Sequence, residues 1–404
     1  MDKKRFIIAS VFLLFCIAIG YLLYLVFFAK KAPDTGVDTG VIDTTTGQFP
    51  TADEGELDED RIIIDTTDLP TAGVVPGRIP SQVTPQVERV VEQPISGTNF
   101  DTSGRANFYD KTDGKFYRLL PDGSVKALSD DVFYNVDKVT WSPVKTESII
   151  EYPDGSNIYY NFETKEQVTL PKHWEDFSFS NLGDKIAAKS IGIAEENRWL
   201  ITAEPQGKNI KLVEPMGNNA SKVTVDWSPN NQIIATSLTG EALGSDRQEV
   251  LFVGQNGENF QSIIVEGRGI ISEWSPQGKK LLYSVYSARN NFNPELWIVN
   301  ADVDSIGTGR KYLSVNTWAD KCTFSNDRFV YCGVPTDLEL GSGFAPELAR
   351  YTPDKLIKID TQTGIKTEIR MDENHTIEEI FVGEYGETIY FTDKNQTGLF
   401  STKL

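Results

Sequence analysis

Short apolar runs alternate with polar turns along the chain beyond residue 100. Three such runs lie at 106–109, 115–120 and 124–128, and Asp-Gly pairs separate them. Aromatic and β-branched residues dominate these runs, a composition typical of β-strands, and Asp-Gly is a strong hairpin-turn signal. No convincing amphipathic helical pattern interrupts the later runs. We therefore expect an all-β domain over residues 101–404.

One motif recurs in this domain at the end of an apolar strand. Its copies are Trp141-Ser142-Pro143, Trp227-Ser228-Pro229 and Trp274-Ser275-Pro276, with weaker ones centred on Phe179, Phe324 and Phe381. A repeat of roughly 40 to 50 residues with four short strands is typical of a β-propeller blade. These anchors and the strands at 106–128 predict seven four-stranded blades, or six if the chain ends share one. We expect a strand from before residue 106 to complete the last blade and close the ring.

The clearest copy of the repeat also resembles a known family. Residues 274–283, Trp-Ser-Pro-Gln-Gly-Lys-Lys-Leu-Leu-Tyr, are similar to the propeller repeat of TolB-type periplasmic proteins and, more loosely, to that of WD-repeat propellers. The resemblance covers about residues 105–404. It implies a β-propeller, and an envelope protein that docks other proteins.

The N-terminal region predicts a membrane anchor. Residues 6–29 carry no charge, and a membrane-spanning helix needs ~20 apolar residues. Because basic residues at positions 3–5 precede this run, the positive-inside rule places residues 1–5 in the cytoplasm and the domain outside the cell membrane. A cleaved signal peptide is the alternative, but its apolar region would be shorter. Lipidation of Cys16 is disfavoured, because Phe15 stands where a small residue is needed.

Residues 30–100 have a different composition. Thr, Asp, Gly and Pro dominate, and residues 54–60 are strongly acidic. So little apolar surface predicts a disordered, self-repelling linker that holds the domain away from the membrane. The acidic run is alternatively a cation or partner site, and the apolar residues 87–91 are a candidate for an additional strand.

Loop lengths indicate a binding face. Neighbouring antiparallel strands run in opposite directions, so all B–C and D–A connections of the propeller, with strands lettered in chain order, lie on one face. The B–C connections at 192–198, 239–248, 288–294 and 335–353 are longer than the tight turn of the second unit. We predict that this face binds an envelope protein or peptide, and tolerated insertions are the alternative. The candidate residues are Asn197, Arg198, Arg247, Arg289, Asn291, Phe292, Leu338, Leu340, Phe344 and Arg350.

Cysteine and histidine positions predict a disulfide and no metal site. Cys322 and Cys332 flank a turn, so antiparallel pairing would place them opposite one another. Outside the cell a disulfide is favoured over two buried thiols. His173 and His375 have no companion at ligand spacing. We predict no metal and no cofactor.

The same survey favours a non-catalytic protein. The sequence contains no Gly-x-Ser-x-Gly elbow and no phosphate-binding glycine motif. Its net charge of −19 would repel nucleic acid. We therefore expect a membrane-tethered scaffold. The alternative is a hydrolase or lyase that acts on extracellular glycan with Asp and Glu in the central channel. Carboxylates clustered in the channel would favour the enzyme, and an apolar patch on the loop face would favour the scaffold.

Overall fold

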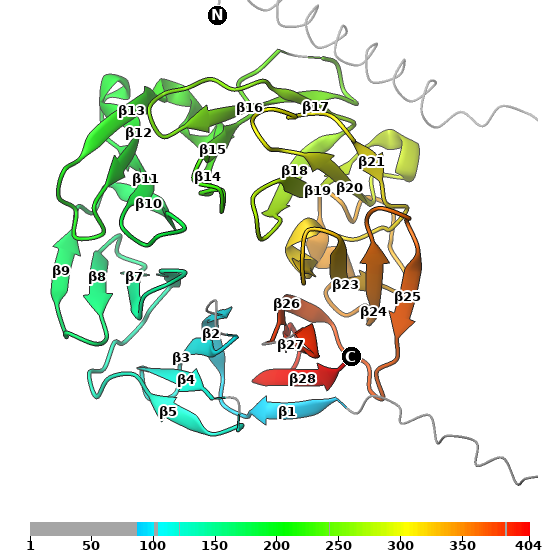
Figure 1. The fold of residues 1–404 in the computed structure, drawn as a ribbon, viewed down its shortest axis with the longest axis horizontal. Helices are drawn as coiled ribbons and strands as arrows, with labels where there is room; N and C mark the ends of the chain where they lie inside the picture. The colour runs from blue at the N-terminus through cyan, green and yellow to red at the C-terminus, as the bar shows by residue number, and fades with distance from the viewer. Residues whose placement is uncertain (1–86, 101–103, 121, 242, 384–385) are drawn as a thin grey trace, which may run out of the picture. The chain divides into compact units, whose positions relative to one another are not determined.

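The computed structural model describes residues 87–404, apart from residues 101–103, 121, 242 and 384–385. Seven antiparallel four-stranded sheets surround a central axis as the blades of a propeller (Figure 1). This confirms the predicted all-β propeller and decides for seven blades over six. The predicted membrane helix at 6–29 and the linker up to residue 86 lie outside the described residues. Within the described part of the chain, no helix is long and apolar enough to cross a membrane.

Each blade has an inner strand A, which borders the channel, followed outward by strands B, C and D. The A strands are β2 (Ile95–Phe100), β6 (Lys138–Trp141), β10 (Trp174–Phe179), β14 (Val223–Val225), β18 (Arg268–Trp274), β22 (Cys322–Phe324) and β26 (Ile377–Val382). The B strands are β3 (Ala106–Asp110), β7 (Glu147–Glu151), β11 (Ile186–Ile191), β15 (Ile233–Ser237), β19 (Lys280–Tyr286), β23 (Phe329–Pro335) and β27 (Thr388–Asp393).

The outer half of each blade and five short 3-10 helices complete the described fold. The C strands are β4 (Lys115–Leu119), β8 (Asn157–Asn161), β12 (Arg198–Ala203), β16 (Gln248–Gly254), β20 (Pro294–Asn300), β24 (Asp354–Asp360) and β28 (Leu399–Lys403). The D strands are β5 (Val125–Ala127), β9 (Gln167–Leu170), β13 (Lys211–Pro215), β17 (Ile263–Val265), β21 (Lys311–Tyr312), β25 (Lys366–Ile369) and β1 (Glu88–Val91). The 3-10 helices are η2 (Glu195–Asn197), η3 (Gly217–Lys222), η4 (Ala288–Asn290), η5 (Ala319–Lys321) and η6 (Pro346–Ala349).

The ring closes with a strand from the N-terminal side of the domain. β1 forms the outer strand of blade seven and pairs with β28, so that Glu88 lies opposite Ser401. The expectation of a closing strand is therefore confirmed. However, β1 and β2 both fall within the range 30–100 that we expected as linker, so the domain begins earlier than residue 101. The sequence did not predict β2, because the polar residues at its centre do not alternate with apolar ones as in a typical strand.

The Trp-Ser-Pro copies of the repeated motif have a packing role, and their aromatic rings lie in the core shared with the preceding blade. The indole Nε1 of Trp141 donates to the carbonyl oxygen of Gly97 in the preceding blade at 2.7 Å. The serine that follows the aromatic residue closes the A–B turn: Ser228 Oγ accepts from the backbone N–H of Ile233 at 2.9 Å, and Ser275 Oγ accepts from that of Lys280 at 3.0 Å. The motif thus joins one blade to the previous one and starts strand B.

A disulfide links the two inner strands of blade six. Cys322 on β22 lies opposite Cys332 on β23, and their sulfur atoms are 2.17 Å apart. Both side chains are buried within the hydrophobic core between blades five and six.

Candidate functional site: a loop ridge and the central channel

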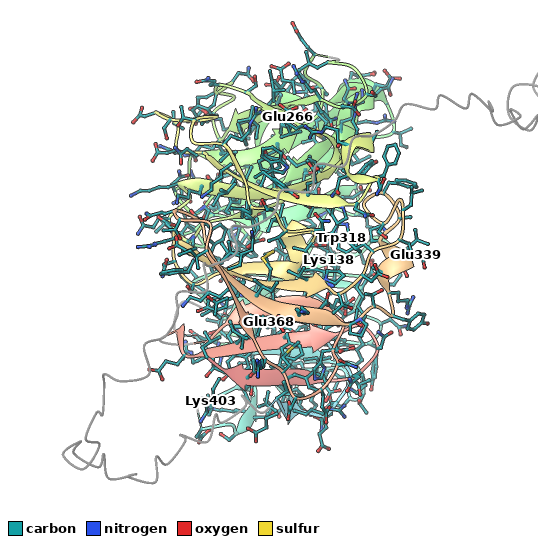
Figure 2. All side chains as sticks on the ribbon, turned by 90° about the vertical axis from the view of Figure 1, so that its right-hand side faces the viewer. Lys138, Glu266, Trp318, Glu339, Glu368 and Lys403 are labelled. Atoms are coloured by element: carbon teal, nitrogen blue, oxygen red, sulfur yellow. A yellow bond between two sulfur atoms is a disulfide. The ribbon has the colours of Figure 1, made fainter. Side chains whose placement is uncertain are left out.

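The B–C loops of blades five and six form a continuous structure, which we call the docking ridge (residues 287–293 and 336–353). The backbone N–H of Gly341 donates to the carbonyl oxygen of Asn291 at 2.9 Å, and that of Gly343 donates to the carbonyl oxygen of Phe292 at 2.8 Å. In the side view, Glu339 of this ridge lies at one face of the propeller, whereas Lys403 lies toward the other (Figure 2). The ridge therefore belongs to the B–C/D–A face.

Aromatic packing holds the ridge in shape. The ring of Phe344 meets the rings of Phe292 and Tyr286 edge-on, with centroids 6.0 and 5.8 Å apart. Gly343 permits this approach, since a Cβ there would lie only 2.5 Å from the Cβ of Tyr286. Asn291 and Phe292 have left-handed backbone conformations, with φ of 53° and 54°. A bulky residue such as phenylalanine adopts that conformation only when its surroundings impose it. The ridge is consequently pre-organised.

The ridge presents large apolar side chains to solvent. The exposed fractions are 72% for Leu340, 59% for Phe344 and 78% for Tyr351. Leu348 and Phe292 are also exposed. Several large apolar side chains on one rigid, hydrogen-bonded pair of loops are typical of an interaction surface.

The structure brings together most, but not all, of the residues predicted for the binding face. Those on the ridge are Asn291, Phe292, Leu338, Leu340, Phe344 and Arg350, with Arg289 at its base. Arg289 Nη2 donates to the carbonyl oxygen of Glu266 at 3.1 Å and lies 3.4 Å from Glu295. This guanidinium therefore supports the loop.

The other predicted residues lie on loops of blades three and four. Arg198 donates to the carbonyl oxygens of Gly192 and Ile193 at 3.1 and 3.3 Å and so holds its own loop. The adjacent Asn197 ends η2. Arg247 forms an exposed ion pair with Glu266 at 3.5 Å. Loop length predicted a binding face on this side of the propeller, but it could not tell which loops bond to one another.

The central channel contains carboxylates contributed by several blades. A cavity of about 480 Å³ is lined by Glu273 on β18, Asp320 in η5 and Glu379 on β26, together with Phe100 and Phe381. The two phenylalanine rings are stacked at 5.0 Å. Phe100 ends β2 just as Trp141 ends β6, so it is a copy of the repeated anchor that the sequence pattern did not reveal.

Protein on all sides of the channel raises the pKa of these acids. The carboxyls of Glu273 and Glu379 reach the channel solvent, but the surrounding blades remove most of their hydration. This desolvation raises the pKa of Glu273 to about 8, and the charges of Asp226 and Asp320 add to it. Desolvation and the neighbouring Glu378 raise the pKa of Glu379 to about 7. The channel therefore holds acids that are partly protonated at neutral pH.

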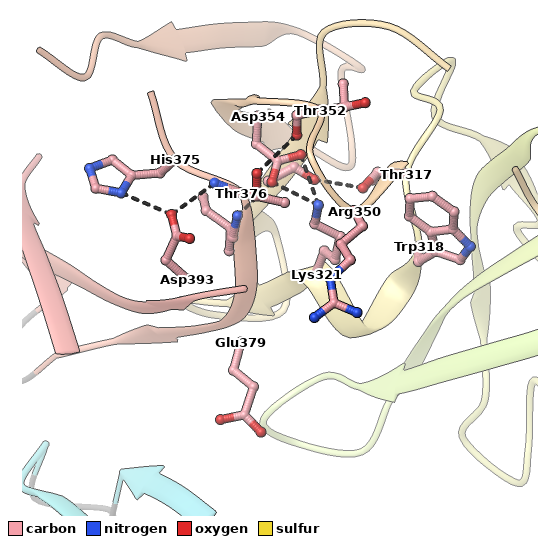
Figure 3. Close-up of polar contacts among 12 residues, drawn as sticks. Thr317, Trp318, Lys321, Arg350, Thr352, Asp354, His375, Thr376, Glu379 and Asp393 are labelled. Carbon is pink, nitrogen blue, oxygen red and sulfur yellow. Dashed lines mark hydrogen bonds and ion pairs between the residues drawn. The ribbon is translucent and has the colours of Figure 1, made fainter. Parts of the chain in front are cut away.

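A buried polar network joins blades six and seven next to the channel (Figure 3). Lys321 Nζ lies 2.8 and 2.7 Å from the two carboxylate oxygens of Asp354, and the backbone N–H of Ile377 donates to the same carboxylate at 2.6 Å. His375 Nδ1 lies 3.1 Å from Asp393 Oδ2. Lys321, Asp354, His375 and Asp393 are all buried.

In this network, burial and the neighbouring charges and hydrogen bonds act on the pKa values in opposite directions. Burial lowers the pKa of Lys321 and raises that of Asp354, although each charge partly offsets the effect on the other. Burial also disfavours the Asp393 anion, but hydrogen bonds from His375 and from backbone N–H groups outweigh it and lower the pKa of Asp393. Sequence reasoning missed these pairs, because their partners are far apart in the chain and share no motif.

Among residues 87–404, the described ones include no group of three or more His, Cys, Asp or Glu side chains that could hold a metal ion.

The fold is a seven-bladed β-propeller, and solved structures of several proteins are similar to it. An oligogalacturonate lyase in complex with manganese is similar over 79% of this chain and 93% of its own, with 13% identity and a TM-score of 0.55. The β-propeller domain of Myceliophteria thermophila Cps50 (Swd1) is similar over 79% and 99%, with 9% identity and a TM-score of 0.53. TolB from Acinetobacter baumannii is similar over 69% and 66%, with 14% identity and a TM-score of 0.43.

The likenesses to the lyase and to the Cps50 (Swd1) domain show the fold alone, because both identities are far below 25%. No protein-family model matches the sequence, and a search of curated proteins found no match.

Proposed function

We propose that the protein is a non-catalytic scaffold, tethered to the cell membrane by residues 6–29 with its propeller outside, which docks another envelope protein through the docking ridge. The observation that carries this proposal is the exposure of Leu340, Phe344 and Tyr351 on a pre-organised pair of loops. Complete burial of a large apolar side chain stabilises a complex by about 1.5–3 kcal/mol. Three such side chains on a rigid base can therefore act as an energetic centre of an interface.

The partner this ridge fits has a complementary apolar groove. The ridge projects from the propeller, so its side chains would enter a concave partner surface. Little ordering entropy opposes binding, because the loops are already bonded to one another. The neighbouring Arg350 and Glu347 form an exposed ion pair at 3.3 Å, which would lie at the polar rim of such an interface.

Paired substitutions test this proposal in cells. We would cross-link the full-length protein, purify it and identify its partners by mass spectrometry, comparing wild type with a Leu340→Glu/Tyr351→Glu variant. The matched control is Leu182→Glu/Ile365→Glu, which charges two side chains of 64% exposure on the opposite face. We expect a specific partner with wild type and control that is lost, by tenfold or more in recovery, with the ridge variant.

An unchanged partner set for all three proteins would reject the ridge as the docking surface. Substitution is sharper here than deletion of the whole loop. Deletion would also remove Ser342 and Ala349, which are buried, and the carbonyl oxygen of Arg350, which accepts from Asn395 Nδ2 at 2.9 Å.

The channel supports a second candidate function, a hydrolase or lyase that acts on extracellular glycan. The observation in its favour is the group of carboxylates with pKa values near neutrality, which suits general acid or base catalysis. The test is incubation of the full-length protein with acidic polysaccharide, followed by measurement of new reducing ends and of the ultraviolet absorbance of unsaturated products. Activity that Glu273→Gln and Glu379→Gln both abolish would establish the enzyme; no activity in the wild type would remove it.

A further inference from the structure

A second concave surface lies on blade two, away from the docking ridge. It is a groove of about 700 Å³ between the D–A connection that precedes β6 and the B–C turn of blade two. Its lining is Tyr134, Asn135, Val136, Tyr152, Pro153, Asp154, Ser156 and Ile158. We call this surface the tyrosine groove.

The tyrosine groove has aromatic and apolar walls. Tyr134 is 73% exposed, although it is a large aromatic residue, and Tyr152 is half-buried against the core between blades one and two. Val136 and Ile158 pack on the same core and form the floor. Asn135 has a left-handed backbone conformation, with φ of 56°, which turns the loop at the groove. Tyr152 thus packs on the core, and Tyr134 is exposed to solvent beside it.

The two loops that form the groove, 128–137 and 152–156, contain aspartates and no basic residue. Asp154 is part of its lining, and Asp130, Asp131 and Asp137 lie in the same D–A connection as Tyr134. Among the described residues that line it there is no Lys, Arg or His. Lys172 at the rim forms an exposed ion pair with Asp154 at 3.0 Å. Hydrogen bonds from Ser156 and the Lys172 side chain lower the pKa of Asp154 to about 2, so this carboxylate stays charged.

Two of the aspartates in and beside the groove already accept hydrogen bonds. Asp154 accepts from the backbone N–H and the hydroxyl of Ser156 at 2.9 and 2.8 Å. Asp131 accepts from the hydroxyls of Tyr160 and Ser129. Aromatic walls beside aspartates suit an extended peptide with proline and basic residues.

We propose that the tyrosine groove binds an extended, proline-rich segment of a partner protein that carries Arg or Lys beside its prolines. The prolines pack between Tyr134 and Tyr152, and the basic side chain lies against the aspartates of the D–A connection. This site is separate from the docking ridge, and it does not depend on the ridge having a partner.

Peptide binding to the purified full-length protein in detergent tests the proposal. The probe is a fluorescein-labelled Arg-Pro-Leu-Pro-Pro-Leu-Pro-Arg peptide, and the paired probe has Glu in place of both arginines. We expect fluorescence anisotropy to show binding of the basic peptide, weakened tenfold or more by Tyr134→Ala and weakened by 0.5 M salt. The basic peptide should bind at least tenfold more tightly than the acidic one.

The control substitution is Ile193→Ala, at a fully exposed apolar residue on the same face but in blade three, which should leave binding unchanged. Asp137→Asn tests the electrostatic part without removing an aromatic ring, and it should weaken binding by severalfold. Equal affinity for the two peptides, absence of binding to wild type, binding that Tyr134→Ala leaves intact, or competition by neutral oligosaccharides would each overturn the assignment.

Discussion

The contribution of a charged pair to the stability of the domain depends on how deeply the pair is buried. The Lys321–Asp354 pair is almost completely removed from solvent, with both carboxylate oxygens within 2.8 Å of the ammonium. Its neighbour in sequence, the Lys355–Glu368 pair, is half-exposed at 3.1 Å. Similar geometry therefore occurs in two environments, and the environment sets the energy of each pair.

Lys321→Met is expected to destabilise the domain by about 3–5 kcal/mol, because it leaves the Asp354 carboxylate buried and unpaired. Lys355→Met should change stability by less than ~1 kcal/mol. Urea unfolding followed by tryptophan fluorescence measures both. The double substitution Lys321→Met/Asp354→Leu should recover part of the loss. A Lys321→Met variant as stable as wild type would show that the pair is not buried as described.

Glu273 makes the stability of the domain depend on pH. Its pKa in the folded protein is about 8, above the usual 4.5, so the folded state holds a proton that the unfolded state releases. Stability therefore falls as the pH rises from about 5 to 8. We expect Glu273→Gln to raise the melting temperature at pH 8 by about 1–3 °C and to have little effect at pH 5. Differential scanning calorimetry of both proteins at both pH values measures this difference. An equal shift of the melting temperature at pH 5 and pH 8 would show that titration of Glu273 is not its cause.

Strands and turns show which parts of the sequence pattern carry structural information. The Trp-Ser-Pro copies predicted the blades because each residue has a local role: the ring packs on the previous blade and the serine closes the A–B turn. In contrast, β2 was not predicted, since Gly97, Thr98 and Asn99 border the channel end of the blade and need no apolar alternation. Pairings between distant segments, such as His375 with Asp393, leave no local signal at all.

The disulfide is a stabilising element of blade six. Cys322 and Cys332 close a loop with a sequence separation of 10, for which chain entropy gives about 2–3 kcal/mol. Reduction with dithiothreitol should therefore lower the melting temperature by several degrees in wild type. A Cys322→Ala/Cys332→Ala variant should melt at the lower temperature with or without the reductant. A wild-type protein that is insensitive to reductant under unfolding conditions would contradict this contribution.

The whole molecule depends on the strand that closes the ring. Val91 on β1 is buried in the core between blades seven and one, so Val91→Asp would place a carboxylate there. We expect it to destabilise the domain by several kcal/mol and to make blade seven sensitive to protease. Limited proteolysis with N-terminal sequencing of the fragments locates the opening. Glu88→Ala, at an exposed position of the same strand, is the matched control and should behave as wild type.

Closure of the ring also determines which blade can form last during folding. β1 and β28 lie at opposite ends of the domain, and pairing them closes a loop of roughly 300 residues, at ~5 kcal/mol of chain entropy. Because β28 follows all the other described strands in the chain, blade seven cannot assemble until those strands have been synthesised. Each nascent chain must therefore pass through a stage in which six blades can form while the edge of β27 is unpaired. That stage, more than the finished ring, is where aggregation competes with folding.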